Sequence, residues 1–292
     1  MSAGTSTIER FDVTVGPFTF QARRAGPAAG RPVLLLHGVP QTSACWVNQL
    51  EALGAAGYHA VAFTQRGYSP GARIDDVDAF TMDKLAGDVI GVADALGFDR
   101  FDVVGHDAGA GVAWHLAAHH TDRVATVAIA SVPHPSAFAA AYRSSKDRDG
   151  DAQHARSGYM RDIVRRPRGE MEQMFLANDG QVLRALFAGL PEASVEEYIE
   201  IVGTPEGMRG CLDWYRATKA DPDFPKIEIP TLYVWSDQDP ALGPEGAHAT
   251  EQFVTGPYRF VVLEGVGHWI PELAPDRFNE ELLAHLAAHP VG

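Results

Sequence analysis

The chain is poor in cysteine: Cys45 and Cys211 are the only two among its 292 residues. Two distant cysteines cannot form a disulfide framework, a cysteine-rich zinc site or a CxxC redox motif. Their scarcity favours a reducing compartment. A chain of this length can bury a substantial core without disulfides or metal ions, and its 46% hydrophobic and 21% charged content is ordinary for a globular protein.

Basic residues are also scarce, since 24 Lys and Arg stand against 38 Asp and Glu, which gives a formal net charge of −14 at pH 7. Nucleic acids and anionic membrane surfaces both bind basic patches. The composition therefore argues against both as partners. A small-molecule substrate, apolar or neutral, is the expected partner instead.

Long apolar runs are absent, because no stretch approaches the roughly 18 residues that span a bilayer. The N-terminal sequence MSAGTSTIERFDV has no apolar segment after a basic start, so no secretory signal is predicted. Together with the low cysteine content, these observations predict a cytoplasmic protein.

The sequence does contain apolar runs that alternate with helical patterns. Two short alternating runs, at 11–15 and 18–22, predict a β-hairpin around Gly16 and Pro17. Continuous apolar runs predict strands buried on both faces of a parallel sheet, at 32–37, 58–63, 101–104, 124–130, 231–235 and 259–263. Helical patterns lie between several of them, at 42–56, 82–96, 108–119 and 274–288. This alternation predicts the α/β class, with a mostly parallel sheet and helices on both faces.

One region breaks the alternation. Residues 136–224 show no convincing strand pattern, and the segment is polar, helical in pattern and rich in Arg and Glu. It contains a polar break at 147–151, and the sheet pattern resumes near Ile229. We predict a helical insertion after about the sixth strand, which divides the core into residues 1–135 and 225–292.

A GxDxG motif joins the apolar run at 101–104 to the helical pattern that follows; it consists of Gly105, His106, Asp107, Ala108 and Gly109. This arrangement is typical of a nucleophile elbow, with Asp where Ser is usual. The glycines two residues before and after leave room for a sharp turn. The turn lifts the central side chain above the carboxyl end of the sheet, beside a helix N-terminus. The alternative is that Asp107 only caps an ordinary helix.

Two further segments supply partners for Asp107. His268 follows the last predicted strand, and Asp237 and Asp239 follow the strand at 231–235. The order nucleophile, acid, histidine is the one found in α/β-hydrolases. We favour Asp239 as the acid because it lies further beyond the strand end and Pro240 follows it, while Asp237 stays open as the alternative.

A loop with the sequence His37-Gly38-Val39-Pro40 follows the first of the continuous apolar runs. In this position a loop donates one backbone N–H to an oxyanion hole, and the residue after the nucleophile donates the other. The predicted donors are the amides of Val39 and Ala108.

Taken together, the chain resembles the α/β-hydrolases with an Asp nucleophile, the branch of epoxide hydrolases and haloalkane dehalogenases. The resemblance covers nearly the whole chain and is carried by HGVP at 37–40, QRGYS at 65–69, GHDAG at 105–109, the insertion, Asp239 and GHW at 267–269. It implies that residues 136–224 form a helical cap over the hydrolase core. It also implies that His106 belongs to the motif without a chemical role of its own.

An Asp nucleophile changes the chemistry. A carboxylate is ionised at neutral pH and can attack a saturated carbon to form an alkyl ester, which a histidine-activated water then hydrolyses. These steps need no metal or organic cofactor. In epoxide hydrolases two cap tyrosines protonate the ring oxygen; Tyr215, within LDWYR at 212–216, resembles one closely, and Tyr159 resembles the other less closely.

Two alternatives to an epoxide hydrolase stay open. Haloalkane dehalogenases resemble this chain but typically carry Trp after the nucleophile and often a polar side chain in the HGxP loop, where this chain has Ala108 and Val39. Fluoroacetate-type enzymes carry Arg after the nucleophile, and residues 108–111 contain none. A dehalogenase is therefore the second hypothesis, and a non-catalytic ligand-binding relative the third. Epoxide hydrolases usually have Trp at the position of Ala108, so this departure predicts a wider pocket.

Overall fold

The structure is a computed structural model that describes residues 7–146, 152–219, 221 and 223–290. The first part of the N-terminal segment considered above, residues 1–6, lies outside the described residues, as does the polar break at 147–151. No helix in the described ranges is long and apolar enough to cross a membrane.

The sheet has eight strands in the order β1-β2-β4-β3-β5-β6-β7-β8. The strands β1 and β2 form the predicted antiparallel hairpin, β2 pairs antiparallel with β4, and all other neighbours are parallel. The strand bounds are Glu9–Val15, Phe18–Ala25, Pro32–Leu36, His59–Phe63, Phe101–His106, Val124–Ala130, Thr231–Ser236 and Tyr258–Leu263. This mostly parallel α/β sheet confirms the predicted fold class.

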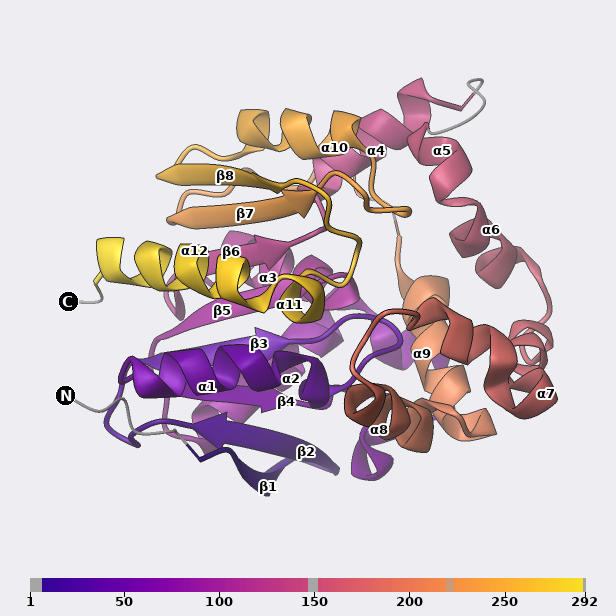
Figure 1. Cartoon of the computed structure of the whole chain (residues 1–292), viewed down its shortest axis with the longest axis horizontal. Coiled ribbons are helices and arrows are strands. Elements are labelled where there is room, and N and C mark those ends of the chain that lie inside the picture. Colours follow the sequence, from indigo (N-terminus) through magenta and orange to yellow (C-terminus); the bar gives the residue numbers. More distant parts are fainter. Residues whose placement is uncertain (1–6, 147–151, 220, 222, 291–292) are drawn as a thin grey trace.

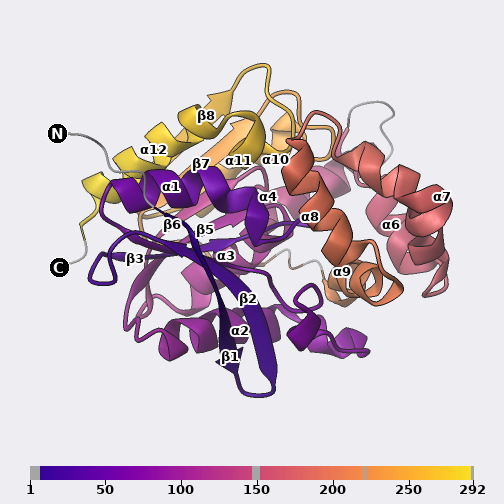
Figure 2. The same cartoon turned by 60° about the horizontal axis from the view of Figure 1, so that its bottom comes forward.

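Helices cover both faces of the sheet (Figures 1 and 2). The helices α1 (Val47–Ala55) and α12 (Pro275–Ala288) pack together on one face, and α2 (Met82–Ala95) and α3 (Ala108–His119) pack together on the other. Shorter elements lie in the loops: η1 Ser43–Trp46, η2 Pro70–Ala72, η3 Val77–Phe80, α10 Pro244–Ala249, η4 Thr250–Phe253 and α11 Ile270–Leu273.

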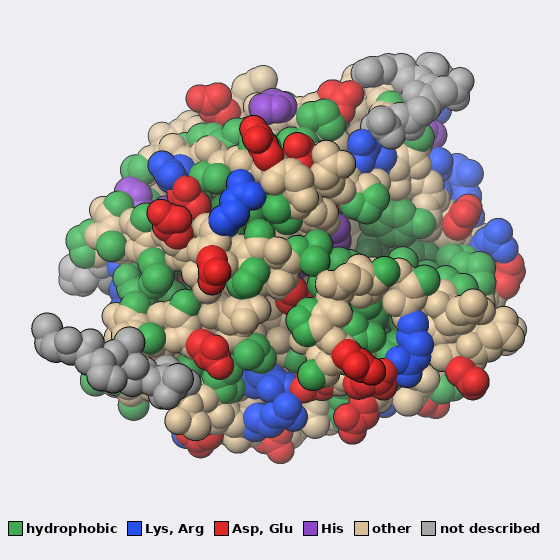
Figure 3. Space-filling view, viewed as in Figure 1, with side chains coloured by type: hydrophobic (Ala, Val, Ile, Leu, Met, Phe, Trp, Pro, Cys, Tyr) green, Lys and Arg blue, Asp and Glu red, His purple; other side chains and the backbone are tan. Residues whose placement is uncertain are grey.

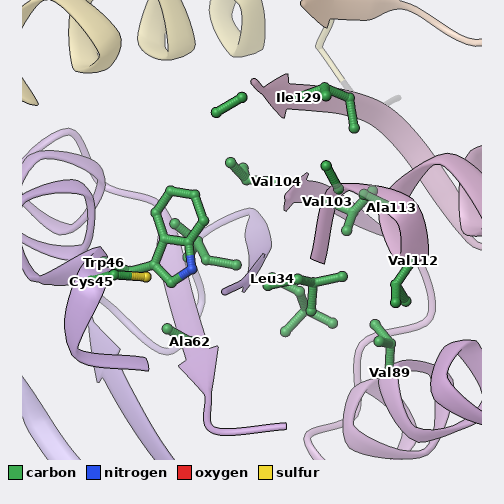
Figure 4. Close-up of a cluster of buried hydrophobic side chains, with 14 of the residues drawn as sticks. Leu34, Cys45, Trp46, Ala62, Val89, Val103, Val104, Val112, Ala113 and Ile129 are labelled. Carbon is green, nitrogen blue, oxygen red and sulfur yellow. The ribbon is translucent and has the colours of Figure 1, made fainter. Parts of the chain in front are cut away.

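The core lies between the central strands and these helices (Figure 4). Leu34 on β3, Val103 and Val104 on β5 and Ile129 on β6 are completely buried. The central strands β4, β5 and β6 are buried at every position. Because both faces of these strands are covered, their sequences are continuously apolar instead of alternating.

The insertion forms six helices in its described part, between β6 and β7: α4 Pro135–Ser144, α5 Gln153–Arg156, α6 Gly158–Arg165, α7 Glu170–Leu186, α8 Glu192–Val202 and α9 Pro205–Ala217. The helices α6 to α9 lie beyond the carboxyl ends of the parallel strands (Figure 1). In contrast, α4 packs against α10 at the edge of the sheet. The helices that can cover a site at the strand ends are therefore α6 to α9.

Close backbone packing and two indole hydrogen bonds fix the insertion to the core. A Cβ on Gly210 of α9 would lie 2.2 Å from the carbonyl oxygen of Gly67, which belongs to the QRGYS segment. Nearby, the Trp214 indole donates a 3.0 Å hydrogen bond to the Arg66 carbonyl. On the opposite side, the Trp269 indole donates a 3.0 Å hydrogen bond to the Leu186 carbonyl at the end of α7. These contacts hold α7 and α9 over the strand ends.

Candidate active site

Asp107 lies between β5 and α3 with a left-handed backbone, φ 50° and ψ −122°. A non-glycine residue rarely adopts positive φ, and such strain is concentrated at functional sites. The flanking glycines are required by close packing. A Cβ on Gly105 would lie 2.6 Å from the carbonyl oxygen of Gly109, and one on Gly109 would lie 2.3 Å from that of Leu36. The chain thus makes the sharp strand-to-helix turn that the GxDxG spacing predicts.

The HGVP loop meets the Asp107 carboxylate from the end of β3. The Val39 amide donates a 2.7 Å hydrogen bond to Asp107 Oδ1. Gly38 leaves the necessary space, since a Cβ there would lie 2.3 Å from the Cβ of Asp107. His37 holds the loop, because its Nε2 accepts a 3.0 Å hydrogen bond from the Gln65 amide. One donor of the predicted oxyanion hole is therefore already bonded to the carboxylate.

The second predicted donor is Ala108, the first residue of α3. Amides in the first turn of a helix have no carbonyl partner within the helix. The Ala108 amide is thus available directly after the carboxylate. Pro40 follows Val39 through a cis peptide bond and continues the HGVP loop toward η1.

His268 lies between two carboxylates. Its Nε2 is 3.3 Å from Asp107 Oδ2, and its Nδ1 is 2.8 Å from Asp239 Oδ2. Burial alone lowers the pKa of His268, but the charge of Asp239 and the hydrogen bonds to both carboxylates outweigh it and raise this pKa to about 10. Burial likewise raises the pKa of Asp107, but the hydrogen bond and charge of His268 outweigh it and lower the pKa to about 2. The free site therefore holds an imidazolium between two ionised acids.

The two candidate acids have different partners. Asp239 is buried, and its Oδ1 accepts hydrogen bonds of 2.8 and 2.9 Å from the amides of Ala241 and Leu242. These bonds turn Oδ2 toward His268. Asp237 is exposed, and its Oδ1 instead accepts a 2.7 Å hydrogen bond from the Gly265 amide in the loop after β8. In the structure Asp239 contacts His268, whereas Asp237 lies outside the site.

The two predicted tyrosines face the site from the insertion. Tyr159 on α6 and Tyr215 on α9 meet edge to face, with ring centroids 5.8 Å apart, and each hydroxyl lies close enough to affect the pKa of the other. Burial, followed by the charge of Asp107, raises the pKa of Tyr159; burial, Tyr159 and Asp107 raise that of Tyr215. Both hydroxyls therefore lie within reach of the Asp107 charge and are protonated at neutral pH.

Tyr159 is 39% exposed, although its hydroxyl lies deep enough for burial to dominate its pKa. The ring of Tyr159 therefore borders solvent while its hydroxyl is turned inward. A hollow with hydrophobic side chains on its walls is visible between the sheet and the insertion (Figure 3). A second groove, between the hairpin and α8, contains the ion pairs of Glu197 with Arg10 and Arg23, and none of its lining residues belongs to this site.

The sequence is similar to known proteins over almost all of its length. The family model for the alpha/beta hydrolase fold matches residues 31–275. The chain belongs to the α/β-hydrolase family. Epoxide hydrolase A of Mycobacterium tuberculosis is 33% identical to this hydrolase over 296 aligned residues, which cover 90% of this chain and 92% of that protein. Epoxide hydrolase 3 of Mus musculus is 30% identical to this chain, and the alignment covers 90% of this chain and 72% of that protein.

Solved structures of epoxide hydrolases have the same fold. Epoxide hydrolase A from Mycobacterium thermoresistibile superposes with a TM-score of 0.84 at 26% identity, over 98% of this chain and 100% of that one. An epoxide hydrolase from metagenomes of hot environments gives a TM-score of 0.84 at 27% identity, over 97% and 100%. These findings confirm the predicted resemblance and the classification of the protein as a hydrolase enzyme.

Sequence reasoning missed several polar residues around the hydrolase site. Gln41 and Glu272 form a buried hydrogen bond behind His106, and His106 contacts the backbone of His268. Trp269 stacks edge to face on His268 at 4.8 Å while its indole bonds to α7. His106 and Trp269 lie within the GHDAG and GHW motifs and Gln41 directly follows the HGVP loop, so position was the available signal for these three, whereas nothing in the sequence pointed to Glu272. Within the part of the chain that the structure describes, no cluster of three or more His, Cys, Asp or Glu is arranged to hold a metal ion.

Proposed function

We propose that this hydrolase is an epoxide hydrolase that converts an epoxide to a vicinal diol through an ester on Asp107. The observation that carries the proposal is the pair of tyrosine hydroxyls, Tyr159 and Tyr215, which face a carboxylate nucleophile from the insertion. An epoxide needs a proton on its ring oxygen as it opens, whereas a halide leaves without one. The names of the relatives described above support the same substrate class.

In the first step, Asp107 attacks one ring carbon and the bond from that carbon to the ring oxygen breaks. Asp107 Oδ1 is bonded to the Val39 amide, so Oδ2 is the attacking oxygen and Oδ1 becomes the ester carbonyl oxygen. The ring oxygen takes a proton from the tyrosine pair. The insertion, for which we keep the predicted bounds 136–224, supplies both tyrosines and shields the site from water.

In the second step, His268 takes a proton from a water molecule, whose oxygen attacks the carbonyl carbon of the ester. The amides of Val39 and Ala108 stabilise the oxyanion. On collapse the ester C–O bond breaks, the departing alkoxide takes the proton of the water-derived hydroxyl, and the diol and the Asp107 carboxylate are formed. His268 becomes a base only after the ester has formed, when its imidazolium proton passes to the tyrosinate left by ring opening; the proton that it then takes from water restores the imidazolium. Ester formation removes the Asp107 charge, one of the two charges that raise its pKa, and Asp239 then stabilises the imidazolium that forms.

The proposal is tested by turnover of a panel of epoxides and haloalkanes, followed by intact mass spectrometry of a His268→Gln variant. We expect diol from an epoxide and no halide release. His268→Gln should accumulate a covalent adduct of the substrate mass on the peptide that contains Asp107, because only the second step needs the base. Halide release without epoxide turnover would make the protein a dehalogenase. Binding without turnover of either class would support the non-catalytic alternative.

The two acids give a matched pair of variants for the second step. Asp239→Asn removes the charge that orients His268, so we expect ester hydrolysis to slow by about 10²–10⁴-fold. Asp237→Asn changes an exposed side chain that accepts a hydrogen bond from the Gly265 amide and does not contact His268, and its rate should stay within about twofold of the parent. Single-turnover decay of the adduct is the measurement. Equal rates for the two variants would show that Asp239 is not the acid.

A further inference from the structure

A chain of buried polar groups runs behind the nucleophile. The Gln41 Nε2 atom lies 2.6 Å from Oε2 of Glu272 on α11, and the Gln41 Oε1 atom lies 3.2 Å from His106 Nδ1. His106 Nε2 lies 2.9 Å from the carbonyl oxygen of His268. All four residues are less than 10% exposed. These hydrogen-bonded groups therefore connect α11 to His106, the residue before the nucleophile, and to the backbone of His268, the proposed base.

The positions of the hydrogens in this hydrogen-bonded chain follow from His106. Burial lowers the pKa of His106 to about 4, so at neutral pH its ring carries a single N–H. That hydrogen must be on Nε2, because the facing carbonyl of His268 only accepts hydrogen bonds. Nδ1 is then an acceptor, and it requires the NH₂ group of Gln41 as its donor. The nitrogen and oxygen of a side-chain amide are assigned from such hydrogen-bond networks, and this network requires the Gln41 amide to be turned end for end from the placement given above.

This orientation of Gln41 determines the state of Glu272. With the NH₂ group on His106, the amide oxygen of Gln41 faces Glu272 Oε2, so Glu272 must donate a proton. The other oxygen of Glu272 is buried and has no hydrogen-bond partner among the described residues. An ionised carboxylate would be left largely unsolvated there.

The groups packed around Glu272 are neutral. The hydroxyls of Tyr198 and Ser194 face it from α8, and the Cys45 thiol lies on η1. The Tyr198 hydroxyl is itself buried without a hydrogen bond of ordinary geometry, although it lies close enough to affect the Glu272 carboxyl. No cation contributes to the pKa of Glu272, which burial raises to about 7 despite the opposing effects of Tyr198, Ser194 and Gln41.

We propose that Glu272 is held as a neutral carboxylic acid and is a positioning residue for both catalytic loops, through Gln41 and His106. Its proton sets the direction of every hydrogen bond in the chain and keeps His106 donating to the His268 carbonyl. Loss of that proton reverses the Gln41 amide and moves the His106 hydrogen to Nδ1. The His268 carbonyl then faces a lone pair, which loosens the loop that presents the imidazole. The effect on catalysis rests on the proposed function, whereas the protonation state does not.

Infrared spectroscopy tests the protonation state without a substrate. At about pH 6 the spectrum of the parent should contain the carbonyl band of a protonated, buried carboxyl group, and above about pH 8 this band should be lost. Solvent-exposed glutamates are ionised throughout the range from about pH 6 to about pH 8. Glu272→Gln should lack the band, and the control Glu264→Gln, which changes an exposed residue, should keep it. A parent spectrum without the band, or one in which Glu272→Gln keeps it, would overturn the proposal.

The pH dependence of stability gives an independent measurement. The pKa of Glu272 is about 7 in the folded protein against an ordinary value of 4.5 in the unfolded chain. Its contribution to stability is therefore complete below about pH 4.5, falls as the pH rises toward 7 and stays low above it. Relative to Glu272→Gln, the parent should lose several degrees of Tm across this range. A constant difference between the two proteins would contradict a raised pKa.

Ester hydrolysis in single turnover measures the positioning role. The amide of Glu272→Gln can donate to the Gln41 oxygen as the acid does, so its rate should show no decline between about pH 6 and pH 8, whereas the parent should slow severalfold. Glu272→Leu has no donor and should be about tenfold slower than Glu272→Gln at every pH. Equal pH profiles for the parent and Glu272→Gln would remove the positioning role. If no epoxide is turned over at all, the proposed function fails while the infrared and stability results still decide the state of Glu272.

Discussion

Replacing Asp107 with alanine is expected to abolish epoxide turnover, with a loss in kcat of at least about 10⁴-fold, as for other hydrolases that lose a nucleophile. The variant has no carboxylate to form the ester, and the tyrosines and His268 have no intermediate on which to act. Turnover of a true substrate and intact mass after mixing are the measurements. Neither diol nor adduct should form.

The control for this experiment is Asp122→Ala, which removes an exposed acid from the turn after α3. It should retain the parent rate within about twofold. A circular dichroism spectrum like that of the parent will show that the variant is folded and that the lost rate is chemical. An Asp107→Ala variant as fast as the parent would rule out covalent catalysis by this residue.

The elbow was predictable from sequence because its geometry dictates its residues. The turn brings Gly105 against the Gly109 carbonyl and Gly109 against the Leu36 carbonyl, and no side chain fits at either contact. The strands were predictable for a related reason, since burial on both faces imposes continuous apolar runs. Steric and burial constraints of this kind restrict which residue types can occupy a position, so they can be recognised in the local sequence.

Choosing between Asp237 and Asp239 needed the structure. Both follow β7 within a few residues, and composition does not tell which carboxylate turns inward. The turn after Asp239 decides it, because the amides of Ala241 and Leu242 bind one oxygen and direct the other to His268. Side-chain direction in a loop depends on such backbone bonds, which leave no periodic signal in the sequence.

Contacts between the insertion and the core were beyond sequence reasoning altogether. Tyr159 and Tyr215 were found through resemblance to a family, since nothing in a helical pattern tells which aromatic residue faces a nucleophile. The partnership of Gln41 with Glu272 joins loops that are far apart in the chain. Its physical meaning, a neutral acid, depends on the order of protons in a hydrogen-bond chain and therefore on atomic positions.

The tyrosine pair provides the prediction that separates epoxide from halide chemistry. The two rings are in edge-to-face contact and each hydroxyl affects the pKa of the other, so each can take over part of the other's role as acid. We expect Tyr215→Phe to slow alkylation of Asp107 by about tenfold and the double variant Tyr159→Phe/Tyr215→Phe by about 10²–10⁴-fold, the usual contribution of general acid catalysis. Stopped-flow measurement of the alkylation phase isolates this step from ester hydrolysis.

Folding should survive these changes, because each removes a single hydroxyl oxygen, and the loss of one hydrogen-bonding group costs only about 1 kcal/mol. Tyr58→Phe is the matched control, since Tyr58 directly precedes β4, at the amino ends of the parallel strands and so at the opposite edge of the sheet from the site. It should alkylate at the parent rate. A halide departs as a stable anion and needs no proton, so a dehalogenase would lose little rate in the double variant. Alkylation by the double variant at the parent rate would therefore remove both tyrosines from the mechanism and leave the choice of an epoxide without its structural support.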